Sequence, residues 1–172
     1  MVGGYLRKND SSFLPDTRIS NSTFIDHPKG FNVANDVYIG HHNFIECSHK
    51  VTIETGCQIT SFVSVTSHSS HDSIRLYGAA YKGKTNLIGY QKGAVFIGAY
   101  TYVGPYTTIM PGSKIGKGCL IAAYSYVQGD FPDFSIIKGN PAAVVGSTKD
   151  RDSAYLKENS ELQQYYNEWA KD

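Results

Sequence analysis

The sequence lacks a surplus of either charge. Its 172 residues include 16 Lys or Arg and 15 Asp or Glu, which gives a formal net charge of +1. A nucleic-acid-binding domain usually carries a clear basic excess, and a membrane-surface segment often carries a basic run. The overall balance therefore predicts neither a nucleic-acid partner nor a polybasic membrane contact.

Long apolar runs and cysteine motifs are also missing. No stretch approaches the roughly 20 apolar residues that a membrane-spanning helix needs. The N-terminal segment MVGGYLRKNDSSFLPD has no apolar core of the signal-peptide kind, so we expect a cytoplasmic protein. The three cysteines form no CxxC pair, which argues against a disulfide framework and against a zinc knuckle.

What the sequence does contain is a period of six. Between Val95 and Val127 an aliphatic residue recurs at every sixth position, namely at Ile97, Val103, Ile109, Ile115, Ile121 and Val127. The residue two positions before each is small or β-branched: Val95, Thr101, Thr107, Ser113, Cys119 and Ser125. Residues two apart in a strand share a face, so each unit is a short strand with one large and one small inward side chain, followed by a corner. The pattern predicts an all-β solenoid in which Cys57 and Cys119 are packing residues.

The same rhythm extends upstream with a regular expansion. Aliphatic residues at Ile19, Ile25, Val33, Ile39, Ile45, Ile53, Ile59 and Val65 are spaced 6, 8, 6, 6, 8, 6 and 6. Because the longer spacing returns at every third unit, three units make one coil and the solenoid is a triangular prism. An ordinary antiparallel sandwich would show looser spacing without this recurrence.

Two segments depart from the rhythm. A gap of 32 residues separates Val65 from Ile97 and predicts a loop at residues 67–94 that projects from one corner. After residue 146 the rhythm ends, and Tyr155, Leu162, Tyr166 and Trp169 follow at helical spacing, which predicts one amphipathic helix docked on the prism or on a neighbouring subunit. We therefore divide the chain into a β-helix domain, residues 1–146 with the inserted loop, and a helical tail, residues 147–172.

These hexads, the histidine-bearing loop SVTSHSSHDS and the closing motif IIKGNPAAVVG resemble the hexapeptide-repeat acyltransferases. The chain is similar in particular to small bacterial sugar and polysaccharide O-acetyltransferases. The resemblance implies a left-handed parallel β-helix, although the general crossover rule would predict right-handed coils. It also implies acetyl-CoA as co-substrate, a homotrimer, and a sugar acceptor in O-antigen or capsule biosynthesis.

Two histidines stand where the stack meets the loop. His68 and His71 follow the last aliphatic residue of the upstream coils, and a rigid anchor suits a general base. Imidazole is suited to that role because its ordinary pKa lies near neutral pH. By the position of the family's catalytic histidine after a short β-branched run, VTSH favours His68 over His71. Either Asp72 or Glu46 can orient the base through its other ring nitrogen.

The remaining candidates concern the two substrates. His41, His42 and His49 belong to an upstream coil and are either acceptor-pocket residues or ordinary surface histidines; we also place Asp72 among the substrate-binding candidates. For acetyl-CoA, the resemblance points to Gly104, Ala122, Ala123, Lys138, Asn140 and Pro141. Small residues are also needed to close tight coils, so the sequence leaves both roles open for the first three.

Other functions on the same architecture remain as alternatives. An N-acetyltransferase acting on a nucleotide-linked amino sugar would use the same residues on an amine. A zinc hydratase like the γ-class carbonic anhydrases would need three converging histidines; His68 and His71 stand three apart rather than in that family's wider pair, and the sequence shows no evident third ligand. A structural or ice-binding solenoid would lack a histidine-bearing insertion. We expect no metal.

Overall fold

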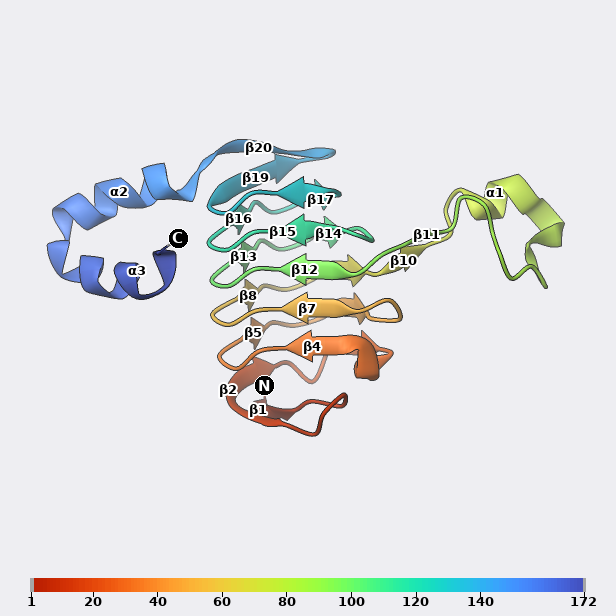
Figure 1. Ribbon diagram of the computed structural model, residues 1–172, viewed down its shortest axis with the longest axis horizontal. Helices are drawn as coiled ribbons and strands as arrows, with labels where there is room; N and C mark the ends of the chain where they lie inside the picture. Colours follow the sequence, from red (N-terminus) through yellow and green to blue (C-terminus); the bar gives the residue numbers. More distant parts are fainter. Residues whose placement is uncertain (1, 172) are drawn as a thin grey trace.

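Each hexad of the sequence forms a strand of two or three residues, and three such strands with their corners make one coil. The computed structural model, which describes residues 2–171, stacks these coils into a three-sided parallel β-helix (Figure 1). We number the faces in chain order. An arm projects from one corner of the prism and a helical tail from another part of it.

Face one is the largest sheet because an antiparallel strand is added at each end. It runs in the order β1 (Val2–Leu6), β2 (Phe13–Ile19), β5 (Tyr38–Ile39), β8 (Gln58–Ile59), β13 (Tyr102–Val103), β16 (Leu120–Ile121), β19 (Ser135–Gly139) and β20 (Ala142–Ser147). The added strands are β1 and β20, which pair with β2 and β19. They occupy the hydrogen-bonding edges of the first and last parallel strands, which would otherwise invite further strand addition.

The other two faces have five strands each. Face two contains β3 (Phe24–Asp26), β6 (Phe44–Glu46), β9 (Ser64–Thr66), β14 (Thr108–Ile109) and β17 (Tyr126–Val127). Face three contains β4 (Phe31–Val33), β7 (Val51–Ile53), β12 (Val95–Ile97), β15 (Lys114–Ile115) and β18 (Asp130–Phe131). A short 3-10 helix, η1 (Pro28–Gly30), lies in the corner before β4.

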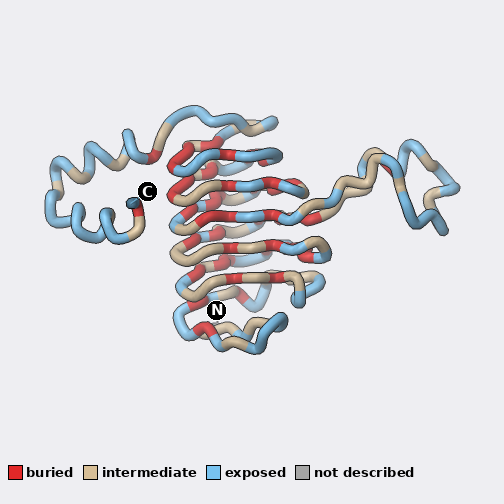
Figure 2. Tube along the Cα trace, viewed as in Figure 1, coloured by how far each residue is buried: buried red, intermediate tan, exposed pale blue. Residues whose placement is uncertain are grey.

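The predicted inward residues form the core. The aliphatic residues from Val33 to Val127 are fully buried in vertical columns, since Ile39 pairs with Ile59, Ile59 with Val103, and Val103 with Ile121 (Figure 2). The small partners are buried too, including Thr101, Thr107 and Ser113. Cys57 and Cys119 lie at such positions, as predicted, and Cys47 is also buried. In the first coil Ile19 and Ile25 are only partly covered, because fewer coils pack against them.

The coils are left-handed. In Figure 1, with the first coil at the bottom, the front strands β7 and β12 run toward the left, and the chain returns toward the right behind them as it climbs. This confirms the handedness that the resemblance implied, against the right-handed rule for ordinary crossovers.

The arm arises at the corner between faces two and three. It is a two-stranded antiparallel ribbon of β10 (His68–Ser69) and β11 (Gln91–Lys92), with α1 (Ser73–Tyr77) and η2 (Gly78–Tyr81) beyond it. The two-residue expansions of the lower coils, between Ile25 and Val33 and between Ile45 and Ile53, fall at this same corner. The corner that tolerates extra length in the lower coils is therefore the one that carries the arm.

The tail differs from the single predicted helix. It contains α2 (Thr148–Glu158) and α3 (Gln163–Ala170), separated by the 3-10 turn η3 (Ser160–Leu162). Asn159 ends α2, because its backbone N–H and its side-chain amide both donate to the carbonyl of Tyr155 at 2.9 Å. An asparagine side chain can compete for backbone hydrogen bonds in this way and end a helix. The spacing of the aromatic and aliphatic residues, on which the prediction of one helix rested, carries no information about such a break.

The break lets α3 return to the prism. Trp169 stacks on Tyr100 and Phe134 with ring centroids 4.6 and 5.8 Å away. Between these two corner residues lies Gly118, where a Cβ would stand 2.8 Å from the Phe134 ring and 3.0 Å from Trp169. Trp169 thus fills the gap that Gly118 leaves in a column of aromatic corner residues. Of the other predicted positions, Tyr166 is half-buried and packs against Trp169 with ring centroids 5.2 Å apart, whereas Tyr155 is 57% exposed and Leu162 41%.

The core register yields a first prediction. Replacing Val103 or Ile121 with Asp should prevent folding, because a carboxylate in this dry column has no partner and its burial costs several kcal/mol. Tyr102→Asp is the matched control, since Tyr102 precedes Val103 on the same strand but is 42% exposed. Urea unfolding followed by circular dichroism should show a cooperative transition for the control only. Cooperative folding of Ile121→Asp would contradict the register.

Candidate active site at the root of the arm

His68 is the first residue of the ribbon, directly beyond the last strand of face two below the arm. Thr66 ends β9, Ser67 is buried, and His68 begins β10 opposite Lys92 of β11. The backbone N–H of Gly93 donates to the carbonyl of Ser67 at 3.0 Å, which closes the base of the ribbon. A side chain at this junction is held by the prism yet extends into the arm.

The buried carboxylate of Glu46 supports His68 from one coil below. Glu46 ends β6, pairs in register with Thr66, and has a side chain that is only 4% exposed. One of its oxygens lies 2.9 Å from Nδ1 of His68. The same oxygen accepts hydrogen bonds from the hydroxyl of Ser67 at 2.7 Å and from its backbone N–H at 3.1 Å, and the other oxygen accepts from the backbone N–H of Ser48 at 2.7 Å.

These hydrogen bonds keep Glu46 ionised. Burial by itself would raise the pKa of this carboxyl, but the donors from Ser48 and Ser67 outweigh it and lower the pKa from 4.5 to about 2. An anion beside Nδ1 favours the tautomer in which Nδ1 carries the proton. Nε2 of His68 has no hydrogen-bond partner within residues 2–171 and is left with its lone pair available.

Aromatic and hydroxyl contacts fix the orientation of the ring. The imidazole of His68 stacks on Tyr90 with centroids 5.6 Å apart, and Nδ1 lies 3.1 Å from the hydroxyl of Ser48. The side chain of His68 remains 34% exposed. Sequence reasoning missed Tyr90, Ser48 and Ser67. The 20-residue coil length would have placed Ser48 and Glu46 beneath His68, but the position of Tyr90 depends on how the arm folds back.

His71 has a different environment. Its Nδ1 lies 2.7 Å from the hydroxyl of Ser69, and its Nε2 lies 3.4 Å from Asp72 and 3.3 Å from Gln91. Asp72 also forms an ion pair with Arg75 at 2.5 Å. Of the two acids considered as orienting residues, Glu46 therefore contacts His68 and Asp72 contacts His71. Of His68 and His71, His68 is the one that combines a buried anion at one ring nitrogen with a second nitrogen that has no hydrogen-bond partner among the described residues.

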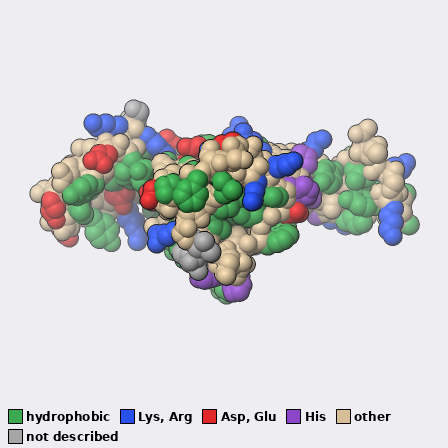
Figure 3. Space-filling view, turned by 90° about the horizontal axis from the view of Figure 1, so that it is seen from below, with side chains coloured by type: hydrophobic (Ala, Val, Ile, Leu, Met, Phe, Trp, Pro, Cys, Tyr) green, Lys and Arg blue, Asp and Glu red, His purple; other side chains and the backbone are tan. Residues whose placement is uncertain are grey.

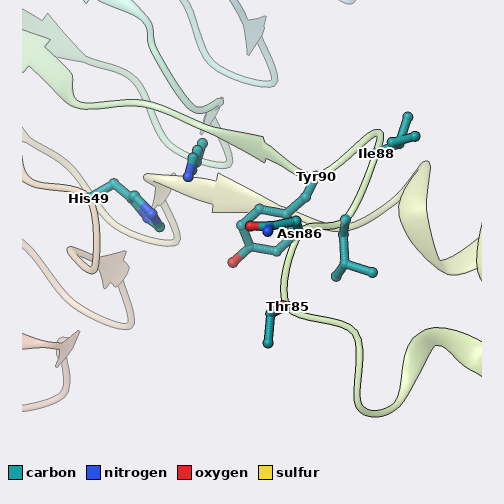
Figure 4. Close-up of a pocket in the computed structure, with 7 residues that line it drawn as sticks. His49, Thr85, Asn86, Ile88 and Tyr90 are labelled. Carbon is teal, nitrogen blue, oxygen red and sulfur yellow. The ribbon is translucent and has the colours of Figure 1, made fainter.

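A cavity of about 570 Å³ opens beside His68 and Glu46 (Figure 4). It is lined by His49, Thr85, Asn86, Leu87, Ile88, Tyr90 and Lys92. His49 comes from the prism corner, with its ring centroid 6.2 Å from that of His68, whereas the other residues come from the returning limb of the arm. The predicted substrate-binding residue His49 thus lines the cavity, together with arm residues that the sequence did not single out.

The other predicted residues lie on a different edge of the prism. His41 and His42 occupy the corner between faces one and two, where His42 heads a stacked column with Phe62, Tyr106 and Tyr124. Gly104 is at the same corner, and a Cβ there would lie 2.6 Å from the backbone nitrogen of Ala123, so coil stacking alone requires glycine. Within one chain these histidines do not join the cluster around His68.

The remaining coenzyme candidates are at or above this same corner. Ala122 and Ala123 belong to it, and Lys138, Asn140 and Pro141 lie in the hairpin from β19 to β20 above it. The backbone N–H of Gly139 contacts the hydroxyl of Ser125 at 3.3 Å, which ties the hairpin to the corner. The residues predicted to bind acetyl-CoA thus lie together at one corner, away from His68.

Metal-ligating side chains gather at one place in the described part of the chain. Ligand atoms of Asp26, His27 and Glu46 lie within 4.8 Å of one another. This set contains two carboxylates and one imidazole rather than the three histidines of the hydratase alternative, and the Glu46 oxygens already accept hydrogen bonds. Among residues 2–171, no helix has the length and apolar character needed to cross a bilayer.

Comparison with known sequences agrees with the repeat. The family model described as "Bacterial transferase hexapeptide (six repeats)" matches residues 94–129. "Putative acetyltransferase YvoF" of Bacillus subtilis is 39% identical over 72 residues, which are 42% of this chain and 41% of that protein. "Putative lipopolysaccharide biosynthesis O-acetyl transferase WbbJ" of Escherichia coli is 28% identical over 114 residues, 65% of this chain and 58% of that protein. The chain thus spans about half the length of these curated relatives.

Solved structures share the fold. A galactoside acetyltransferase in complex with coenzyme A superposes with a TM-score of 0.63 at 20% identity, covering 80% of this chain and 65% of the other. The D94A mutant of AntD, an N-acyltransferase from Bacillus cereus, in complex with dTDP and coenzyme A gives a TM-score of 0.61 at 19% identity, covering 81% of this chain and 87% of the other. At these identities the likeness concerns the fold.

The fold and the repeat define the class: a left-handed parallel β-helix built from hexapeptide units. Residues 94–129 match the hexapeptide repeat of bacterial transferases, and the chain shares its fold with solved acetyltransferase structures.

The Glu46 site yields a second prediction. Because the folded protein holds the pKa of Glu46 at about 2 instead of 4.5, its ionised form stabilises the fold above pH 4.5, and this contribution is lost as the pH falls toward 2. The difference in unfolding free energy between the wild type and Glu46→Gln should therefore shrink by up to ~3 kcal/mol over this range. Urea titrations across the pH range measure it. Glu158→Gln, at an exposed position of α2, should show no such trend. A pH-independent difference for Glu46→Gln would contradict the assignment.

Proposed function

We propose that the chain is an acetyl-CoA-dependent acetyltransferase that uses His68 as its general base. The observation that carries the proposal is the contact of His68 Nδ1 with the buried, ionised Glu46 beside the cavity at the root of the arm. An imidazole that a third group orients through one nitrogen can act as a general base with the other.

The geometry supports a direct transfer. The acceptor occupies the cavity with a hydroxyl at Nε2 of His68, which takes the proton while the hydroxyl oxygen attacks the thioester carbonyl of acetyl-CoA. Glu46 stabilises the imidazolium that forms. Collapse of the tetrahedral intermediate breaks the carbon–sulfur bond, the proton passes from His68 to the leaving sulfur, and the products are an acetyl ester and free coenzyme A. No covalent enzyme intermediate is needed.

The acceptor that we favour is a sugar hydroxyl of a bacterial surface polysaccharide such as O-antigen or capsule. The name of WbbJ and the sugar acetyltransferases among the structural neighbours support this class. A cytoplasmic location belongs to the same proposal, because the reaction consumes acetyl-CoA. An amine of a nucleotide-linked amino sugar is the second candidate, because AntD has been solved with dTDP-4-amino-4,6-dideoxyglucose and coenzyme A. A panel of matched hydroxyl and amine acceptors separates the two.

We also propose a homotrimer in which each active site is shared. In one chain His68 lies at the corner between faces two and three, whereas Gly104, Ala122 and Ala123 lie at the corner between faces one and two. The base and the proposed acetyl-CoA edge therefore belong to different corners. A closed ring of three prisms brings one corner of each chain against a different corner of its neighbour.

The role of His68 can be tested by substitution. His68→Ala should lower kcat for acetyl transfer by about 100-fold or more while leaving acetyl-CoA affinity nearly unchanged, because the imidazole acts on the acceptor proton and does not hold the donor. In the wild type, kcat/KM should fall as acidification protonates the free base. His71→Ala is the matched control from the same loop and should have a weaker effect. A reversed order would exchange the two roles, and two active variants would exclude a histidine base in this loop.

The shared site can be tested by mixing subunits. His68→Ala removes the base, and Ala123→Trp fills the proposed donor edge at an exposed position, so each variant alone should be nearly inactive. In randomly mixed trimers roughly a quarter of the sites would combine two intact halves, so about that share of wild-type activity should return. Sedimentation of the same samples reports the oligomeric state. A fully active monomer, or mixtures without recovered activity, would contradict the shared site.

A further inference from the structure

The near-zero net charge hides a strong local asymmetry. From residue 73 to residue 129 the chain carries six Lys or Arg side chains and no Asp or Glu, whereas the rest of the chain holds all 15 acidic residues. Four of the six cations belong to the arm, namely Arg75, Lys82, Lys84 and Lys92. Figure 3 shows histidines at the root of the arm and basic and hydrophobic side chains along it. The arm therefore presents a positive potential beside His68.

Lys92 is the cation nearest to the proposed chemistry. It stands directly opposite His68 in the ribbon of β10 and β11, and it lines the cavity. Directly opposed residues of an antiparallel pair project to the same side, with Cβ atoms about 5 Å apart. The ammonium of Lys92 can thus reach a group about one sugar ring away from a hydroxyl at His68.

No acidic group satisfies Lys92. Its side chain is exposed and has no ion-pair partner within residues 2–171, whereas Arg75 in the same arm is already engaged by Asp72. The other polar residues that line the cavity, including Thr85 and Asn86, are neutral. An acceptor with an anionic group would therefore meet a cation that has no ion-pair partner among the described residues, in a cavity whose lining residues include no acidic side chain.

We propose that the acceptor is an anionic glycosyl residue whose carboxylate or phosphate pairs with Lys92 while its hydroxyl reaches His68. This inference rests on the proposed acetyl transfer and names its substrate class. A charge-assisted hydrogen bond to an ammonium strengthens binding by about tenfold or more. Because Lys92 is exposed, a neutral sugar would leave it hydrated rather than buried and unpaired, so the preference is quantitative and not absolute.

Binding to the full-length protein is the direct test. Isothermal titration with glucose 1-phosphate, glucuronate and glucose distinguishes a phosphate, a carboxylate and no anion on one ring. At least one anionic probe should bind the wild type about tenfold more tightly than glucose, and more weakly at high salt. Lys92→Gln should remove this preference and Lys92→Arg should retain it. Lys114→Gln removes another of the six cations in residues 73–129, one that lies on face three. This control should leave the preference for anionic probes unchanged.

Each outcome decides between the two proposals. Equal binding of charged and neutral probes, no binding of any anion, or an anion affinity that Lys92→Gln leaves unchanged would overturn the anionic acceptor. Release of coenzyme A from acetyl-CoA with the same sugars is measured separately. If release requires the anion and Lys92→Gln raises the acceptor KM but not the acetyl-CoA KM, Lys92 recognises the acceptor and not the coenzyme. Anion binding at Lys92 with no release for any sugar would instead overturn acetyl transfer.

Discussion

The whole structure depends on coils that close in register, so that each residue stacks on its equivalent in the next coil. The interior is narrow, and each strand supplies one aliphatic and one small side chain to it, as in the column from Ile39 through Ile59 and Val103 to Ile121. A change of length inside a strand would turn its inward residues outward. Extra residues are therefore tolerated only at corners, and the arm lies at the corner that the lower coils already expand.

The same stacking joins the scaffold to the proposed chemistry. Register places Glu46 next to Thr66 of the following coil, so its buried carboxylate meets the hydroxyl and N–H of Ser67 and the ring of His68. A buried anion is costly unless donors satisfy it, and here Ser48 and Ser67 lower its pKa to about 2. The orientation of His68 is thus fixed by the prism, whereas Tyr90 and the cavity are contributed by the arm.

Corners also organise the outer surface. One edge carries the stacked rings of His42, Phe62, Tyr106 and Tyr124, and another carries Tyr100 and Phe134 with Trp169 inserted above Gly118. Each column arises because equivalent corner residues lie one coil apart, within stacking distance. The tail uses this spacing for attachment: an aromatic residue from α3 occupies the place where the corner sequence has glycine.

The sequence by itself determined the prism, the corner that expands, the inserted arm and the position of His68 at its root, because a period of six with a recurring two-residue expansion admits few other folds. Only the tertiary structure decided between Glu46 and Asp72, brought Tyr90 and Lys92 to His68, separated His41 and His42 from it, and broke the tail at Asn159. Those features depend on how irregular segments fold back, where contacts come from residues distant in the chain and no repeat dictates their register.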